Sequence, residues 1–158
     1  MVPVQGPETT AHKSKVITVR TIDNQAKADA IQAEWKGSLG QVYWQEDKQW
    51  DFSALAAEGG AISMVLRVDK APKKGVDLKM DCGYPCAGTL NLTHLFKAVP
   101  EGQWFRISLK LDCFEEAGAN LEHIVSPLVV ATTGDFILSF ADVRLLQNPP
   151  AESLVACG

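Results

Sequence analysis

The sequence has no uninterrupted run of apolar residues that approaches the length of about 18 residues needed for a membrane-spanning helix. It also has no excess of positive charge, because 15 Lys and Arg stand against 19 Asp and Glu, a formal net charge of −4. These two absences argue against membrane insertion and against nucleic acid as a partner. The first residues do not combine a basic segment with an apolar one, so we expect the export signal, if there is one, to lie elsewhere in a longer chain.

Groups that are typical of catalysis are also scarce. His12, His94 and His123 have no nucleophile motif beside them. Glu115 and Glu116 are adjacent on a predicted helical turn and therefore point in different directions. We interpret them as solvated side chains and not as an acid/base pair. The sequence thus predicts that this chain alone is not an enzyme.

The chain has only four cysteines. Cys82 and Cys86 enclose the turn-rich tripeptide Gly-Tyr-Pro, and we predict that they form a disulfide in an oxidising compartment. The pairing of Cys113 and Cys157 stays open. Either they form a disulfide, or Cys113 is a buried thiol and Cys157 is a free residue of the tail. A zinc site of four thiols is disfavoured, because the later cysteines lack a second Cys-x-x-Cys spacing.

What the sequence does have is alternation of polar and apolar residues, the pattern of half-buried strands. The stretch 104–111 is the clearest case, and 31–35 is interpreted as a strand although its composition also suits a helix. Such strands without a long helix predict an all-β fold, an antiparallel β-sandwich with one or two short helical turns, at residues 15–147. We expect a disordered linker at 1–14 and a tail at 148–158. The predicted strands are 16–22, 31–35, 41–45, 62–69, 76–80, 88–92, 104–111, 128–132 and 136–145.

Turn signals connect these strands. The turn at 71–75 predicts a hairpin of 62–69 with 76–80, and the turn at 133–135 predicts a hairpin of 128–132 with 136–145. Brief helical turns are expected at 51–55, at 93–98 with Thr93 as N-cap, and at 113–117 with Asp112 as N-cap.

The aromatic residues are the best candidates for ligand binding. Trp44 and Trp50 lie in a polar stretch, where an indole face can stack on a sugar ring while Gln, Glu, Asp and Lys bond its hydroxyls. Tyr84, at the tip of the cysteine loop, is a third candidate sugar-binding residue. The alternative is that Trp44 and Trp50 close the ends of the sandwich. Trp35 and Trp104 are assigned to the core.

Asp142 is a carboxylate in an otherwise apolar strand and needs a partner there. Arg144 is one possibility. A structural calcium ion is the other, with Asp142 and an N-terminal acid, Asp23 or Asp29, as ligands.

Five short motifs occur in a recognisable order. They are Asp-Phe-Ser at 51–53 with Gly-Gly-Ala at 59–61, Leu-Arg-Val-Asp-Lys-Ala-Pro at 66–72, Cys-Gly-Tyr-Pro-Cys at 82–86, Gly-Gln-Trp at 102–104 with Leu-Asp-Cys-Phe at 111–114, and Leu-Ser-Phe-Ala-Asp-Val-Arg-Leu at 138–145. In this order they resemble the C-terminal galactose-binding-like domain of bacterial family 3 glycoside hydrolases of the exo-β-glucanase (ExoP) type, and the resemblance covers roughly residues 16 to 146.

The resemblance implies a jelly-roll sandwich that follows the two catalytic domains of a β-glucosidase or exo-1,3/1,4-β-glucanase in the periplasm or outside the cell. The nucleophile and acid/base of that family belong to the catalytic domains, and no segment here matches them. The leading hypothesis is therefore a non-catalytic, carbohydrate-binding-like accessory domain that binds β-glucan or gluco-oligosaccharides. The alternative is a structural domain that packs on the catalytic domains of the same parent chain without binding sugar.

Overall fold

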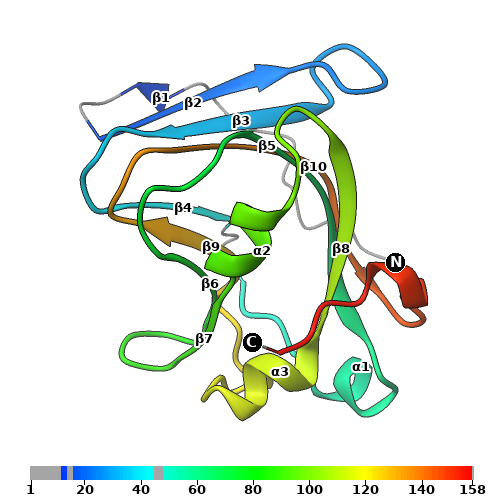
Figure 1. Ribbon diagram of the computed structural model, residues 1–158. Helices are drawn as coiled ribbons and strands as arrows, with labels where there is room; N and C mark the ends of the chain where they lie inside the picture. Colours follow the sequence, from blue (N-terminus) through cyan, green and yellow to red (C-terminus); the bar gives the residue numbers. More distant parts are fainter. Residues whose placement is uncertain (1–11, 14–15, 45–47, 158) are drawn as a thin grey trace.

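The computed structural model describes residues 12–13, 16–44 and 48–157. These residues form two antiparallel sheets with three short α helices (Figure 1). The six-stranded sheet has the order β1–β2–β3–β10–β5–β8, with strands His12–Lys13, Ile17–Ile22, Ala30–Trp35, Phe136–Leu146, Ala61–Lys70 and Trp104–Lys110. The four-stranded sheet has the order β4–β9–β6–β7, with strands Gly40–Trp44, Ser126–Thr132, Val76–Asp81 and Ala87–Asn91. The predicted all-β antiparallel sandwich is confirmed.

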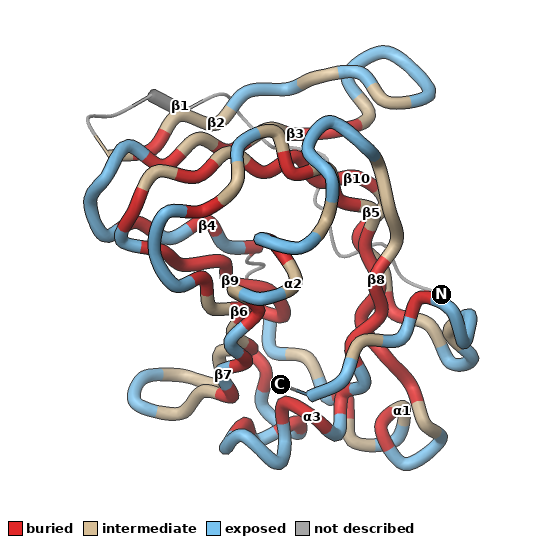
Figure 2. Tube along the Cα trace, viewed as in Figure 1, coloured by how far each residue is buried: buried red, intermediate tan, exposed pale blue. Residues whose placement is uncertain are grey.

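The core lies between the two sheets and is built from alternating side chains. In β3 and β10, Trp35 stacks on Phe136 with ring centroids 5.4 Å apart, and Phe96 packs on the same ring. The Trp35 indole N–H donates to the carbonyl oxygen of Gly40, so this buried polar group is satisfied. Trp35 is therefore a core residue, as predicted. Figure 2 shows the buried positions concentrated along the central strands, with exposed positions in the loops.

The helices α1 (Ser53–Ala57), α2 (Thr93–Ala98) and α3 (Leu111–Glu116) are each about one turn long and lie between strands. The predicted N-caps are wrong: α3 begins before Asp112 and has Lys110 at its N-cap, and neither α2 nor α3 has a side-chain cap bond. Thr93 instead accepts the backbone N–H of Val76 with its hydroxyl. α3 lies close to β7 at Gly88. A Cβ added to this glycine would lie only 2.2 Å from the carbonyl oxygen of Phe114, so the close approach requires glycine.

The two predicted hairpins are not formed. β5 and β6 belong to different sheets, and so do β9 and β10. The turns at 71–75 and 133–135 therefore carry the chain from one layer of the sandwich to the other. β6 pairs with β7 and β9, while β5 pairs with β8 and β10.

Both cysteine pairs are oxidised. Cys82 and Cys86 form the predicted disulfide, and Cys113 and Cys157 form a second one. The linker prediction for 1–14 falls almost entirely outside the described residues, except for β1, which pairs with β2. The described part of the predicted tail, residues 148–157, is docked: it contains the 3-10 turn Ala151–Ser153, and Leu154 forms a parallel bridge with Ser108 of β8.

Candidate functional site

The strand β4 presents one aromatic ring to solvent and one to the core. Its burial alternates strictly, with Val42 and Trp44 inward and Gln41 and Tyr43 outward. Tyr43 is 57% exposed, whereas Trp44 is 6% exposed and forms a T-shaped pair with Phe140, with ring centroids 5.0 Å apart. The sequence prediction of Trp44 as a sugar platform misses Tyr43, although the alternation with Val42 already places Tyr43 on the polar side of the strand.

Tyr43 belongs to a row of side chains that crosses the whole four-stranded sheet. Cross-strand partners lie on the same side of a sheet, so the registers place these residues together on its solvent face. We call this surface the Tyr43 face. Its two rows are Tyr43, Val129, Lys79 and Thr89, and Gln41, Ala131, Asp77 and Asn91.

The centre and the rim of the Tyr43 face differ in chemistry. At the centre, Val129 and Ala131 of β9 are buried, whereas Gln41, Thr89 and Asn91 at the flanks are exposed. The Asn91 amide nitrogen lies 3.4 Å from a carboxylate oxygen of Asp77, and the Asn91 amide oxygen accepts the backbone N–H of Thr93. The amide is thereby oriented. The face combines one aromatic ring with planar hydrogen-bonding groups at fixed positions.

Trp50 lies beyond the end of β4 and is half-buried. Its backbone pairs with Ile124, its ring packs on Phe52 at 5.8 Å, and the Lys48 ammonium lies 5.5 Å from the ring centroid. The indole N–H is buried and has no hydrogen-bond partner among the described residues. Trp50 thus contributes less free ring surface than Tyr43, and its packing matches the alternative reading of a side chain that closes one end of the sandwich.

Tyr84 has the opposite environment. It occupies the tip of the loop between β6 and β7 and is 100% exposed. Asp81, at the start of this loop, accepts the backbone N–H of Gly83 with its carboxylate at 2.8 Å. Trp44, Trp50 and Tyr84 therefore do not form one cluster: Trp44 is in the core, Trp50 is half-buried against Phe52, and Tyr84 is exposed on a loop.

The outer face of the six-stranded sheet carries a different set of residues. A continuous register row runs through Arg20, Gln32, Ser139, Arg67 and Trp104. The Arg67 guanidinium lies 4.8 Å from the centroid of the Trp104 ring. The assignment of Trp104 to the core is therefore wrong, because Trp104 is half-buried on the polar side of β8.

Charged groups connect the strands of this surface, which we call the arginine face. Asp69 of β5 binds Arg67 at 2.5 Å and Gln32 at 2.8 Å. Elsewhere on the same surface, Asp142 binds Arg106 and Arg144. The arginine face comprises Gln32, Arg67, Asp69, Trp104, Arg106, Ser139, Asp142 and Arg144.

Asp142 occupies a β-bulge of β10, where the register with β5 shifts and its φ is +50°. Its partner Arg144 was one of the two predicted alternatives and is confirmed. These residues do not fit a calcium site, because two guanidinium groups already bind the Asp142 carboxylate and would repel a cation. Asp23 accepts the backbone N–H of Ala28 instead.

No group of three or more His, Cys, Asp and Glu side chains with the geometry of a metal site occurs in the part of the chain that the structure describes. Asp29, the alternative acid, accepts backbone N–H groups of the 24–26 turn. These bonds, first that of Asn24, hold its pKa below the ordinary value. The predicted calcium ion thus has no supporting donor set among the described residues.

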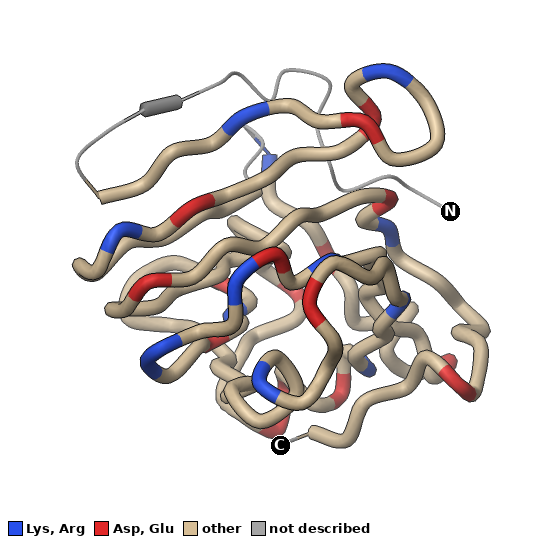
Figure 3. Tube along the Cα trace, turned by 45° about the horizontal axis from the view of Figure 1, so that its top comes forward, with Lys and Arg blue, Asp and Glu red and all other residues tan. Residues whose placement is uncertain are grey.

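In Figure 3, Lys and Arg are interspersed with Asp and Glu along the described chain. No helix of the described residues is long and apolar enough to cross a membrane. Two stacked antiparallel sheets, with chain crossings between them and short helices in the connections, define an antiparallel β-sandwich domain.

The particular family follows from the sequence match. The model of the Exop_C family, described as galactose-binding domain-like, matches residues 4–145, and the chain therefore belongs to this family. The resemblance inferred from the five motifs is confirmed. No curated protein matches the chain.

Solved structures show the same fold at low sequence identity. The chain is similar to the exo-1,3/1,4-β-glucanase of a Pseudoalteromonas species, with 15% identity and a TM-score of 0.73 over 89% of this chain and 17% of that one. It is also similar to the extra C-terminal domain of that enzyme, with 16% identity and a TM-score of 0.74 over 91% of this chain and 78% of that domain. A family 30 carbohydrate-binding module of a Clostridium thermocellum cellulosomal cellulase has 11% identity and a TM-score of 0.65, with 89% of this chain and 91% of that module covered.

Proposed function

We propose that this domain is a non-catalytic accessory domain of a β-glucan-degrading family 3 glycoside hydrolase and that it binds glucan on the Tyr43 face. The observation that carries the proposal is the exposed Tyr43 ring on the same sheet face as the exposed polar side chains of Gln41, Thr89 and Asn91. The family and the similar structures, which include a carbohydrate-binding module and an exo-glucanase, support it.

The chemistry of the face suits a neutral sugar chain. A pyranose ring presents C–H groups on its flat side, which pack on an aromatic ring, and hydroxyls at its edge, which need donors and acceptors. On the Tyr43 face, the exposed Tyr43 ring provides the first kind of contact. The side chains of Gln41 and Asn91 provide the second.

The two disulfides support a location outside the cytosol, in the periplasm or beyond, because structural disulfides persist in oxidising compartments. The bond-breaking groups would belong to catalytic domains of the same parent chain. The chain spans only 17% of the similar exo-glucanase, which leaves ample length for such domains in a protein of that kind.

The test is a calorimetric titration of the domain with laminari- and cello-oligosaccharides. We expect millimolar to micromolar binding of at least one series, and we expect Tyr43→Ala to weaken it at least about tenfold, or about 1.4 kcal/mol, because the ring contact is lost. Tyr43→Phe is the matched control and should bind as the unaltered protein does. Absence of binding at millimolar sugar, or unchanged binding by Tyr43→Ala, would contradict the proposal.

A second function is favoured by the arginine face. Asp69 holds Arg67, and Asp142 holds Arg106 and Arg144, in two clusters that together involve four strands. Such a pre-ordered charged surface, with Trp104 at its edge, resembles in composition the contact regions between proteins, which are enriched in Arg and aromatic residues. The rival proposal is that the domain packs on its catalytic domains through this face and stabilises them.

A further inference from the structure

The tip of the β6–β7 loop carries an aromatic side chain that the Tyr43 face does not use. Tyr84 is 100% exposed, more than Tyr43 at 57%. A fully exposed aromatic ring leaves a large apolar area in water, and free energy is gained when a ligand covers that area. The loop therefore has the composition of a contact element, although it lies outside the sheet.

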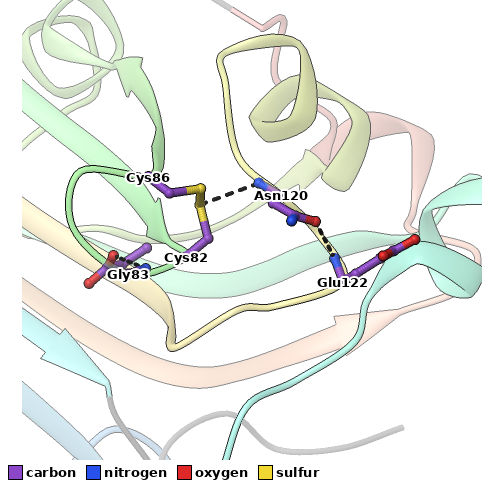
Figure 4. The surroundings of a disulfide bond; sticks show 6 residues. Cys82, Gly83, Cys86, Asn120 and Glu122 are labelled. Atoms are coloured by element: carbon purple, nitrogen blue, oxygen red, sulfur yellow. Dashed lines mark hydrogen bonds between the residues drawn. A yellow bond between two sulfur atoms is a disulfide. The ribbon is translucent and has the colours of Figure 1, made fainter.

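The loop that carries Tyr84 is held by a disulfide and by several hydrogen bonds. The Cys82–Cys86 disulfide closes it, the Gly83 N–H donates to Asp81, and the Cys86 N–H donates to the Gly83 carbonyl oxygen at 2.7 Å. From outside the loop, the Asn120 N–H lies 3.3 Å from the Cys82 sulfur (Figure 4). A ring on a pre-ordered support loses little conformational entropy when it binds.

The loop continues the two strands that form half of the Tyr43 face. Lys79 is the outward residue of β6 next to Val129, and Tyr84 follows five residues later. At about 3.3 Å per residue, Tyr84 lies up to about 17 Å beyond Lys79 along the strand direction. Tyr43 is on β4, two strands away from β6 in the sheet order, so Tyr43 and Lys79 are also separated by about 10 Å across the strands. Tyr84 thus lies outside both register rows of the Tyr43 face, and one sugar ring does not stack on both tyrosines at once.

We propose that Tyr84 is a second, separate sugar-stacking site, which contacts glucan chains that extend beyond the Tyr43 face or lie beside the bound chain. This inference rests on the proposed glucan binding. Two sites on one rigid domain raise the apparent affinity for a polymer through effective concentration, and they leave the affinity for a short ligand unchanged. The signature of the second site is therefore a dependence on ligand length.

The experiment compares Tyr84→Ala, Tyr84→Phe and Tyr43→Ala. Each variant is titrated with β-gluco-oligosaccharides of increasing length and is run in affinity electrophoresis through soluble β-glucan. We expect Tyr84→Ala to bind a trisaccharide normally and to bind the polymer roughly three- to tenfold more weakly, as the loss of one ring contact implies. Tyr84→Phe should match the unaltered protein, and Tyr43→Ala should lose affinity for both ligands.

The possible results are separable. If Tyr84→Ala binds the polymer as tightly as the unaltered protein while Tyr43→Ala does not, the second site is refuted and the proposed function stands. If Tyr84→Ala weakens trisaccharide binding as strongly as polymer binding, Tyr84 belongs to a single site and the inference is also refuted. If the unaltered protein binds neither ligand, both proposals fail.

A loop variant tests the role of rigidity. Cys82→Ser with Cys86→Ser keeps the tyrosine and removes the covalent closure of the loop. We expect polymer affinity between those of the unaltered protein and Tyr84→Ala, because the ring must then be ordered on binding. Near-ultraviolet circular dichroism confirms that the sandwich is intact. Polymer binding below that of Tyr84→Ala would show that the loop acts through the sheet and not through its ring.

Discussion

Asp69 is the residue on which the arginine face is centred. Its carboxylate accepts hydrogen bonds from Ser139, Gln32 and Arg67, which come from three neighbouring strands. Burial acts to raise the pKa of Asp69, but the bonds from Ser139, Gln32 and Arg67 outweigh it and lower the pKa from its ordinary value of 3.8. The native state therefore prefers the charged form more strongly than the unfolded chain does.

This preference predicts how stability depends on pH. At pH 7, Asp69→Asn should lower the free energy of unfolding by about 1–3 kcal/mol, because donors on β3, β5 and β10 lose a charged acceptor. The stabilisation by Asp69 is present above the unfolded pKa and is lost as pH falls from near 3.8 through the lower folded value, so the difference between the two proteins should shrink there. Urea denaturation at pH 7 and at pH values below 4 measures both effects.

The control is Glu122→Gln, which removes an exposed carboxylate. It should leave the free energy of unfolding within about 0.5 kcal/mol of the unaltered protein at neutral pH. A constant gap between Asp69→Asn and the unaltered protein at all pH values would show that Asp69 acts by packing and not by charge.

For individual residues, the sequence predicts which side of a strand a side chain occupies better than it predicts which side chain binds a ligand. The alternation in 104–110 groups Trp104 with Arg106 and Ser108, and the structure places Trp104 and Arg106 on the polar side of β8. In β4, the same rule separates Tyr43 from Trp44. The sequence predictions for Trp44 as a sugar platform and Trp104 as a core residue do not follow this rule. For both residues, the alternation gives the side of the strand that the structure shows. A one-residue difference in a strand exchanges core and solvent.

At the scale of elements, the C-terminal segment covers the edge of the larger sheet. β8 is an edge strand, and the segment pairs with it where the Val155 N–H donates to the Ser108 carbonyl oxygen. The Ser153 and Ser108 hydroxyls are 2.8 Å apart, and Cys157 is bound to Cys113 of α3. Covering an edge strand in this way removes a template for pairing with other chains.

The two disulfides should contribute unequally to stability. The Cys113–Cys157 bond spans 44 residues and the Cys82–Cys86 bond spans 4. In the chain-entropy model, their removal costs up to about 4 and about 2 kcal/mol, respectively. We therefore expect Cys113→Ser with Cys157→Ser to lower the urea midpoint more than Cys82→Ser with Cys86→Ser. The opposite order would indicate that the short loop stabilises the native sheet directly.

The arrangement of elements was less predictable than their existence. Strands such as β5 and β8 follow from alternation, and they are found close to the predicted ranges. Their pairing does not follow, because the turn at 71–75 is compatible both with a hairpin and with a crossing between sheets. The choice is made by β9, which is buried on both sides and takes the place beside β6. A partner so distant in the sequence leaves no local signal.

At the scale of the whole molecule, the two outer faces differ in chemistry. The Tyr43 face has an aromatic ring and amide groups around an apolar centre, and the arginine face has three guanidinium groups and two carboxylates. Since the faces belong to different sheets, the proposed binding of a neutral polymer to one face would leave the other face free for the proposed packing on a protein surface. The two proposed functions are therefore compatible.

Ionic strength distinguishes the two faces. Ring stacking and hydrogen bonds to a neutral sugar involve no net charge, whereas contacts of exposed charged groups are screened over a Debye length of about 10 Å at 0.1 M salt. We expect glucan affinity to change less than about twofold between about 50 and 500 mM NaCl, and Arg67→Ala to bind glucan as the unaltered protein does. Calorimetric titrations at the two salt concentrations provide the measurement. A large loss of affinity in salt, together with weak binding by Arg67→Ala, would place the sugar on the arginine face, because only there are guanidinium groups concentrated among the described residues.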